Sequence, residues 1–475
     1  MSGKISREEF KVKLNHLLTS LRKQISEGEY KVGEYLPSEL ILAEQYGLSK
    51  NSVRKGLEEL VSEGLIVKKS RIGNQVISSQ PFDQTILRVG YYPNLLKDAV
   101  FQKLIKQFEE ENPSVKIQTI SLPYDHYQQT VQDFMENEML DAVTINYKDY
   151  SDFDTEFRNV FEPMNKNDSI YPFLQKPFET REYQDEVYVR PFVFSPIVLC
   201  YNKDHFDASG ISYPDSGWKW DEALSAAGRL MNFSKEEGTC GLYFHPLSLN
   251  RWPIFLLQNR VAAEYSADGE VAMNGLLESV NLIRKIFDEQ GIMQTFLSDS
   301  NKDAETLFVD QKASMIMSSY FSLNEIASHE VSYDIAPLPY LKDPKTLLLI
   351  IGLAVNKHSK KKKAAQSFVD FISSEETQER IRIETLSIPA VKKVAERQGG
   401  EKVYKPSRYF LFREIIPTFS LYTDLGLYSK ELNELRKELR IYLSDLMDDK
   451  IFYQRISKNL SKKDSVDSRR IKGGE

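Results

Sequence analysis

The chain has 475 residues, of which 41% are hydrophobic and 28% are charged, so it is too long for one core and ordinary in composition for a globular protein. The net charge of −7 is unevenly divided, because residues 1–80 carry 13 Lys and Arg against ten Glu and the remainder carries −10. A basic start on an acidic body favours a nucleic-acid-binding unit joined to a second module.

Several classes of protein are disfavoured by the sequence. Its two cysteines, Cys200 and Cys240, are too few for a disulfide framework and lack metal-ligand spacing, so we expect both to be reduced and buried. The longest apolar run, 347–355, is far shorter than the roughly 20 residues that span a bilayer. The first 30 residues show no apolar stretch followed by a cleavage site. We therefore expect a cytoplasmic protein without membrane contact.

Three short helices are predicted in the first 65 residues. Ser6 and Glu9 form a capping box ahead of an apolar stripe with helical spacing. Ser38 caps a second helix, Gly47 makes a turn, and Ser49 caps a third helix. Two short helices joined by a glycine-containing turn form a helix-turn-helix.

The beginning of the third helix and the segment after it carry residues suited to DNA. Arg can bond a guanine edge at two atoms and Asn an adenine edge, and recognition helices use their first residues. These residues are Lys50, Asn51, Ser52 and Arg54. Two apolar stretches, 65–67 and 75–77, then flank a basic hairpin that carries Lys68, Lys69, Arg71 and Gly73. An ordinary helix trio with a solvated basic loop is the alternative, but the order of all the pieces favours DNA binding.

The segment 30–66 resembles the winged helix-turn-helix (α+β) of the GntR family. The matching motifs are Leu36-Pro37-Ser38-Glu39, Leu42-Ala43, Tyr46-Gly47-Leu48-Ser49, Val53-Arg54 and Glu63-Gly64-Leu65-Ile66. The resemblance implies a DNA-binding domain over 1–78, in which the residues facing DNA are Ser38, Ser49, Asn51, Ser52 and Arg54, with Gly73 at the wing tip. Leu40 replaces the arginine that this family usually carries there, so one DNA contact is expected to be missing.

After a polar linker, 79–84, strands alternate with helices. The strands expected first are 86–92, 115–122 and 141–147, with helices over 95–111 and 124–139, which predicts a mostly parallel sheet. Ligands bind such sheets at the carboxyl ends of strands. Aromatic and polar residues follow those ends: Tyr92, Asn94, Tyr124, Asp125 and Asn146. Ring faces and hydrogen-bonding groups suit a sugar, although many of these tyrosines could equally be packing residues.

Residues 85–395 also resemble the bacterial extracellular sugar-binding proteins that serve ABC importers. The motifs include Tyr124-Asp125-His126-Tyr127, Pro191-Phe192, Tyr201-Asn202-Lys203, Ala336-Pro337-Leu338-Pro339 and Ile388-Pro389-Ala390. The resemblance implies a periplasmic-binding-protein-like α/β module (type II) over 85–455, with two lobes, a hinge and the ligand in the cleft. It adds Tyr320 or Phe321 as the ring that stacks on a sugar, and Arg190 and Trp252 as further ligand residues. Residues 456–475 are expected to be a polar tail.

The reading that combines both modules is a ligand-responsive transcription regulator. We expect a homodimeric repressor of carbohydrate uptake or utilisation genes that binds double-stranded operator DNA and a sugar or oligosaccharide. A polyamine, an anion or a peptide is the alternative ligand, and a uronate is favoured if Arg190 and Arg251 both face the cleft. A pyridoxal-phosphate enzyme is disfavoured because no Schiff-base lysine loop or phosphate cup is found. No catalytic residue, cofactor or metal is expected.

Overall fold

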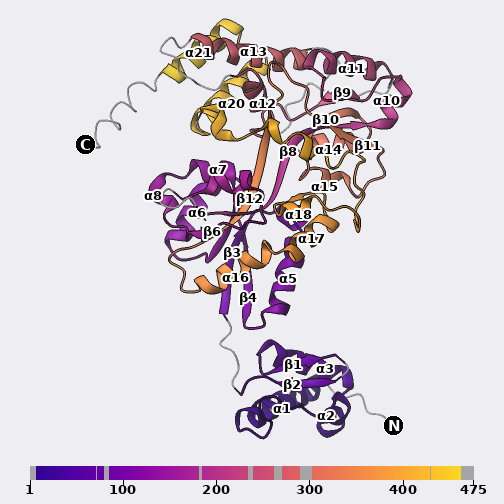
Figure 1. The fold of residues 1–475 in the computed structure, drawn as a ribbon, viewed down its shortest axis with the longest axis vertical. Helices are drawn as coiled ribbons and strands as arrows, with labels where there is room; N and C mark the ends of the chain where they lie inside the picture. The colour runs from indigo at the N-terminus through magenta and orange to yellow at the C-terminus, as the bar shows by residue number, and fades with distance from the viewer. Residues whose placement is uncertain are drawn as a thin grey trace, which may run out of the picture.

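The chain folds into a small N-terminal domain and a larger α/β module, shown in Figure 1 as a computed structural model. The structure describes residues 7–70, 72–79, 85–180, 185–233, 239–260, 270–288, 302–427 and 429–461. Each of the two parts has its own buried apolar cluster. The two parts therefore have separate apolar cores.

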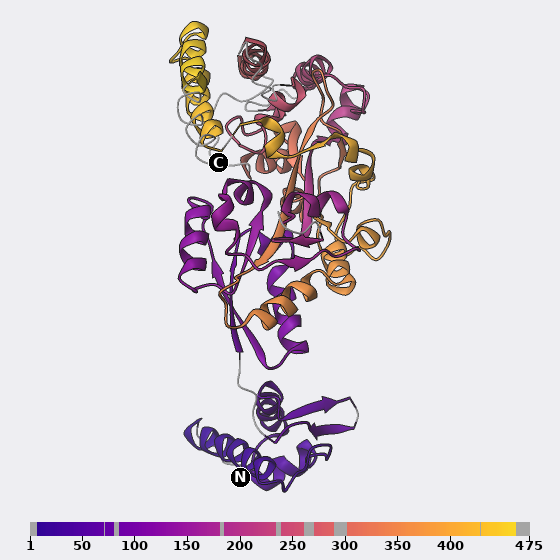
Figure 2. The same cartoon turned by 60° about the vertical axis from the view of Figure 1, so that its left-hand side comes forward.

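Three helices and a β-hairpin form the N-terminal domain, as predicted. The elements are α1 (Arg7–Ser26), α2 (Glu39–Tyr46), α3 (Lys50–Ser62), β1 (Ile66–Lys69) and β2 (Gly73–Val76). Gly47 adopts φ +59° between α2 and α3, and its N–H donates to the carbonyls of Ala43 and Glu44. This left-handed conformation favours glycine and sets the angle of the turn. Figure 2 shows the hairpin extending away from the helices.

A ten-stranded sheet forms the centre of the larger module, and seven of its strands lie in the order β4-β3-β5-β12-β8-β10-β9. Their bounds are β3 (Thr85–Tyr91), β4 (Val115–Ser121), β5 (Ala142–Asn146), β8 (Arg190–Asn202), β9 (Cys240–Tyr243), β10 (Ala313–Ser319) and β12 (Thr346–Val355). Three further strands join it: β11 (Tyr333–Ala336), β13 (Ile388–Pro389) and β14 (Phe419–Ser420). A separate pair consists of β6 (Met164–Asn165) and β7 (Glu186–Val187).

Two long strands, β8 and β12, connect the halves of this module (Figure 1). Residues 190–196 of β8 pair with β12, and residues 197–202 pair with β10 and β11. All thirteen residues of β8 are buried, as expected of a strand that is covered on both faces. The module therefore has two lobes that share a continuous pair of strands.

Helices cover the sheet in both halves. Lobe 1 contains β3, β4 and β5 with α4 (Leu95–Asp98), α5 (Phe101–Glu111), α6 (Tyr127–Glu136), α7 (Tyr147–Asp152), α8 (Thr155–Arg158), α9 (Pro172–Gln175), α16 (Lys362–Ile372), α17 (Glu375–Glu384) and α18 (Lys392–Ala395). Lobe 2 contains β9, β10 and β11 with α10 (Lys203–Ser209), α11 (Trp220–Phe233), α12 (Pro253–Gln258), α13 (Glu270–Asp288), α14 (Lys302–Val309), α15 (Leu323–Ile326), α19 (Leu411–Glu414), α20 (Ser429–Leu443) and α21 (Asp449–Ser461).

Three predictions about this module are wrong in detail. The sheet is parallel where β3 meets β4 and β5, but β12 runs antiparallel to both β5 and β8 at its centre. The helix predicted over 95–111 is two helices, because Val100 between them adopts φ +45°. The polar tail does not begin at 456, since α21 continues to Ser461 and Ile456 is buried against the core.

Cys200 and Cys240 are both buried thiols, as predicted. Within the described ranges, no helix combines the length and the apolarity that crossing a membrane requires.

Candidate functional site

The first turn of α3 exposes the residues predicted to read DNA. The hydroxyl of Ser49 accepts a hydrogen bond from the backbone N–H of Ser52 at 3.2 Å, which fixes where the helix begins. Lys50 and Asn51 are exposed, and Ser52 and Arg54 are half-buried. Ser38 caps α2 in the same way, through the N–H of Ile41. The capped start of α3 thus presents polar side chains to solvent on one turn.

Glu39 connects this helix to the hairpin. Its Oε2 atom accepts a hydrogen bond from Arg54 Nη2 at 2.8 Å, and its Oε1 atom lies 3.7 Å from Lys68 Nζ. The hydrogen bond from Arg54 lowers the pKa of the Glu39 carboxyl. A single carboxylate therefore orients one basic side chain of the helix and one of the wing.

The predicted wing residues occupy the hairpin. Lys69 is exposed and pairs in register with Gly73, which adopts φ +143° at the start of β2. The predicted contact Arg71 lies outside the described residues. The tight connection between the strands requires the glycine because L side chains rarely adopt this backbone conformation.

A cleft of about 640 Å³ lies between the lobes, and a narrower cavity of about 130 Å³ adjoins it. Four residues line both spaces: Asn94 and Tyr124 from lobe 1, and Asn250 and Phe321 from lobe 2. The two cavities are therefore parts of one interlobe site. Residues 348–351 of β12 line its deeper part, where the lobes join.

Five residues predicted from strand ends and motifs line this cleft: Tyr92, Asn94, Tyr124, Asn146 and Phe321. Tyr92 stacks between Tyr124 and Tyr127, at centroid distances of 5.7 and 4.0 Å. The Tyr124 hydroxyl donates a hydrogen bond to the Asn94 side chain. Lobe 1 thus contributes a stack of rings with amide groups beside it.

Three ionisable groups line the cleft although they are buried: Asp98 on α4, Glu305 on α14, and Arg251 before α12. Burial raises the pKa of Asp98 to about 7, an effect that the hydrogen bond from the Asn94 amide reduces. Burial also raises the pKa of Glu305 to about 7, although Arg251 opposes the shift. Burial therefore disfavours the ionised form of both carboxyl groups.

The Arg251 guanidinium is held by backbone carbonyls. Its Nε atom donates to the carbonyl of Met317 at 2.9 Å, and its Nη1 atom donates to that of Asn250 at 3.3 Å. Burial lowers its pKa. Among the described residues, no set of three or more His, Cys, Asp or Glu side chains is placed to hold a metal ion.

Three predicted ligand residues lie outside the cleft. Tyr320 is fully buried, and its hydroxyl donates to the carbonyl of Tyr409 at 2.8 Å. Trp252 is fully buried in the core of lobe 2. Asp125 is exposed and borders neither cavity. Those assignments are corrected: of the adjacent pair 320 and 321, the ring that faces the cleft belongs to Phe321, since alternate residues at a strand end point to opposite sides.

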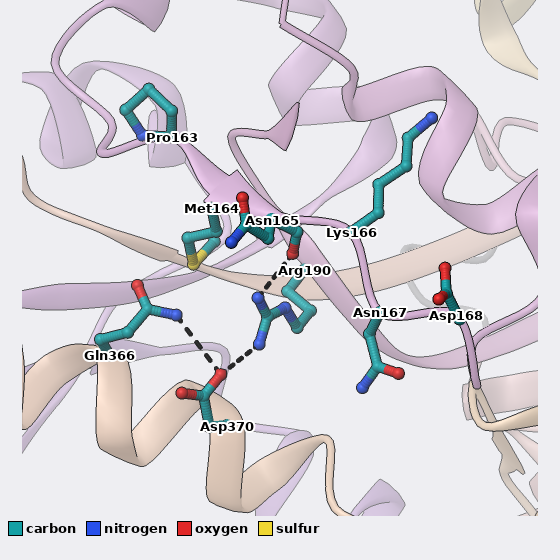
Figure 3. A pocket seen from close by; sticks show the side chains of 9 residues that line it. All are labelled: Pro163, Met164, Asn165, Lys166, Asn167, Asp168, Arg190, Gln366 and Asp370. Carbon is teal, nitrogen blue, oxygen red and sulfur yellow. Dashed lines mark hydrogen bonds and ion pairs between the residues drawn. The ribbon is translucent and has the colours of Figure 1, made fainter. Parts of the chain in front are cut away.

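Arg190, the fourth, lines a different pocket on lobe 1, drawn in Figure 3. Its guanidinium pairs with Asp370 of α16 and donates to the carbonyl of Asn165 at 2.7 Å. Arg190 begins β8, whereas the cleft lies where β8 enters lobe 2, so the prediction that it faces the interlobe ligand is wrong. A uronate was favoured only if Arg190 and Arg251 both faced the cleft, and Arg190 does not.

Four further residues line the cleft that were not predicted from the sequence, namely Asp98, Asn250, Glu305 and Tyr422. Asp98 follows Asn94 by one helical turn, and that spacing is the signal that could have placed both side chains together. The Tyr422 hydroxyl donates a hydrogen bond to the Asn250 side chain, although the two residues are more than 170 positions apart in the sequence. No local pattern predicts a contact over that separation.

Comparison with known proteins assigns both modules. Residues 92–379 match the family described as bacterial extracellular solute-binding protein. The chain belongs to this solute-binding protein family. Residues 14–76 match the bacterial regulatory proteins of the gntR family, so the solute-binding protein fold here follows a GntR helix-turn-helix.

Curated relatives of this solute-binding protein match its two modules separately. A protein of Brucella abortus named as a binding protein is 24% identical over 247 residues, which make up 50% of this chain and 59% of that protein. The chain thus spans about three-fifths of that relative. The transcriptional regulator GmuR of Bacillus subtilis is 28% identical over 105 residues, which cover 21% of this chain and 44% of the regulator.

Solved structures share the fold of the larger module. The substrate-binding protein Lmo0181 of Listeria monocytogenes, in complex with cycloalternan, has a TM-score of 0.65 and 19% identity over 80% of this chain and 99% of its own. Maltose-bound MalE3 of T. maritima has a TM-score of 0.68 and 16% identity over 79% and 99%. These likenesses establish the two-lobed architecture.

Proposed function

We propose that the protein is a transcription regulator whose DNA binding responds to a sugar or oligosaccharide held between the lobes. The main support for this proposal is that one chain contains both a GntR helix-turn-helix and a solute-binding fold with a cleft between its lobes. A DNA reader acts where the chromosome is, so the solute-binding fold serves here as a cytoplasmic sensor. We propose a repressor of carbohydrate uptake or utilisation genes.

The lining of the cleft supports a saccharide as ligand. Tyr124 and Phe321 offer ring faces from opposite lobes, and Asn94, Asn146 and Asn250 offer amides that donate and accept hydrogen bonds. The solved relatives described above were crystallised with a cycloalternan and with maltose. A ligand that touches both lobes binds the closed arrangement more tightly and shifts the population toward it.

Closure changes DNA binding if the protein acts as a homodimer. Helix-turn-helix dimers bind half-sites about 34–36 Å apart, so a modest change in the spacing of two α3 helices alters the fit. We propose that a saccharide releases the operator. Sedimentation of the full chain with and without operator DNA tests the dimer, and a monomer under both conditions would exclude it.

The decisive experiment measures DNA binding against ligand. Double-stranded sequences selected from a random pool by the full chain are labelled, and their affinity is measured by fluorescence anisotropy with mono- and oligosaccharides, polyamines, inorganic anions and peptides. We expect a saccharide to weaken binding at least tenfold, and DNA to weaken saccharide binding by the same factor. If only a polyamine, an anion or a peptide changed the affinity for DNA, the protein would still be a ligand-responsive regulator, but its ligand would not be a carbohydrate.

A further inference from the structure

Two of the carboxyl groups that line the cleft are buried. Asp98 is 5% exposed and Glu305 is 2% exposed, and neither forms an ion pair with a basic residue in the part of the chain that the structure describes. The lysine next to Asp98 in sequence, Lys97, pairs instead with Glu325 at 2.7 Å. A buried carboxylate without a counter-ion is unfavourable, so each group favours its neutral form until a cation arrives.

One buried cation faces these two acids. The Nε and Nη1 atoms of the Arg251 guanidinium donate hydrogen bonds to backbone carbonyls. Its positive charge opposes the rise that burial causes in the pKa of Glu305, but not the rise in the pKa of Asp98. Two other basic residues of the lining, Lys302 and Arg436, are exposed to solvent, where water and salt weaken their effect, and a third, His245, is partly buried. Among the buried side chains of the lining, two are carboxyl groups and one is a cation.

The carboxyl groups lie on opposite walls of the cleft. Asp98 belongs to lobe 1 and Glu305 to lobe 2, and the rings of Tyr124 and Phe321 are divided in the same way. Aromatic faces attract cations, as carboxylates do. A positive charge in the cleft would interact favourably with both lobes at once, which is the property that a ligand needs to favour closure.

We propose that the saccharide bound in the cleft carries a protonated amine, so that the effector is an amino sugar or an oligosaccharide of amino sugars with its ammonium group at Asp98. The inference rests on the proposed function and narrows its ligand. The Asn94 amide holds the Asp98 carboxyl in place for the ammonium. Binding converts Asp98 from its neutral to its ionised form, and the proton is released to solvent.

Matched ligands test the proposal on the full chain. Glucosamine and its β-1,4 oligomers are compared with glucose, with the corresponding cello-oligomers and with the N-acetylated forms, which remove the charge at the same position. Titration calorimetry at pH 6.5 in buffers of different ionisation enthalpy measures affinity and proton release together. We expect the amine forms to bind at least tenfold more tightly than both neutral forms, with release of more than half a proton per site.

Two variants separate the role of Asp98 from general effects. Asp98→Asn should remove the preference for the amine forms over the neutral forms and most of the proton release. Asp125→Asn, a matched change at an exposed carboxylate of the same lobe outside the cleft, should preserve both. Equal or tighter binding of the neutral forms without proton release would overturn the amine and leave the saccharide sensor intact. Binding of none of these saccharides would overturn both proposals.

Discussion

Lys97 of lobe 1 and Glu325 of lobe 2 form an ion pair across the interlobe cleft, with Nζ and Oε2 2.7 Å apart. The two side chains are 45% and 36% exposed, so solvent and salt screen the attraction between them. Exposed pairs of this kind contribute about 0–1 kcal/mol. The pair therefore biases the angle between the lobes without locking it.

Breaking this pair should weaken ligand binding slightly. Glu325→Gln and Lys97→Met are each expected to reduce saccharide affinity by no more than about fivefold. Each change removes an interaction that stabilises this arrangement of the lobes by only about 0–1 kcal/mol. Calorimetry at low and high salt checks this, and the deficit should shrink as salt rises. Lys106→Met, which breaks an exposed pair within α5 alone, is the control. A larger loss of saccharide affinity that does not depend on salt would contradict the view that solvent screens the Lys97–Glu325 pair.

Arg54 and Lys69 should differ in how they affect DNA binding. Arg54→Ala is expected to lower affinity for the selected operator by about 1–3 kcal/mol and to relax sequence preference, because this arginine is predicted to read a base. Lys69→Ala should weaken all sequences alike and reduce the slope of log affinity against log salt by about one, because this lysine of the wing is predicted to contact phosphate. Anisotropy titrations at four salt concentrations, with operator and scrambled DNA, separate the two. Identical behaviour of both variants would refute these roles.

Adjacent aromatic residues should separate binding from stability. Phe321→Ala removes a ring that lines the cleft and is expected to reduce saccharide affinity about three- to tenfold. Tyr320→Phe removes the buried hydrogen bond to the Tyr409 carbonyl and should lower the free energy of unfolding by about 1–2 kcal/mol with affinity unchanged. Urea denaturation and calorimetry of both full-length variants make the comparison. If Tyr320→Phe lost affinity instead, the assignment of the two rings would be reversed.

Asp98 should make stability depend on pH. Its pKa rises from 3.8 in the unfolded chain to about 7 in the folded protein, so the folded state binds more protons between these values. The stability that this group contributes is present below pH 3.8 and is lost as the pH rises to about 7. Asp98→Asn should therefore be more stable than the wild type at pH 8, by at most about 4 kcal/mol, and the difference should shrink toward pH 4. Melting curves from pH 4 to 8 test this, and a constant difference would argue against burial of the charge.

Gly352 permits the close approach of the strands that join the lobes. A Cβ atom at this position would lie 2.6 Å from the Arg190 carbonyl oxygen and from a Val189 methyl group, at the point where the β8–β12 register shifts. Gly352→Ala is expected to lower the free energy of unfolding by about 1–3 kcal/mol, through overpacking. Urea denaturation measures it beside Gly228→Ala, a helical position of α11 whose Cβ would meet no atom within 4 Å. Equal effects of both changes would rule out crowding as the cause.

Local patterns predicted the N-terminal domain well because its contacts are local. The caps at Ser38 and Ser49 and the turn at Gly47 each follow from a residue type at a fixed spacing, and all three are found. The direction of the central strands could not be read in this way. A buried strand such as β8 has the same apolar sequence whether its neighbour runs parallel or antiparallel, and the β12 residues that pair with it are more than 150 positions away in the chain.

The cleft was predictable only in part. Asn94 and Asn146 follow strand ends, so the rule for the edges of parallel sheets placed them correctly. Arg190 and Trp252 were chosen from motifs, which do not determine the direction of a side chain. Arg190 turns toward Asp370, and Trp252 turns into the core, because a complete set of neighbours decides each orientation.

The N-terminal domain is tethered to one lobe alone, since the chain enters the larger module at Thr85, the first residue of β3. The proposed closure would rotate one lobe against the other and leave lobe 1 internally unchanged. In a dimer whose interface is formed by lobe 2, each lobe 1 would move on closure and would displace the DNA-binding domain attached to it. In a dimer fastened through lobe 1, the two readers would keep their spacing. Where two copies meet therefore determines how far a signal from the cleft travels.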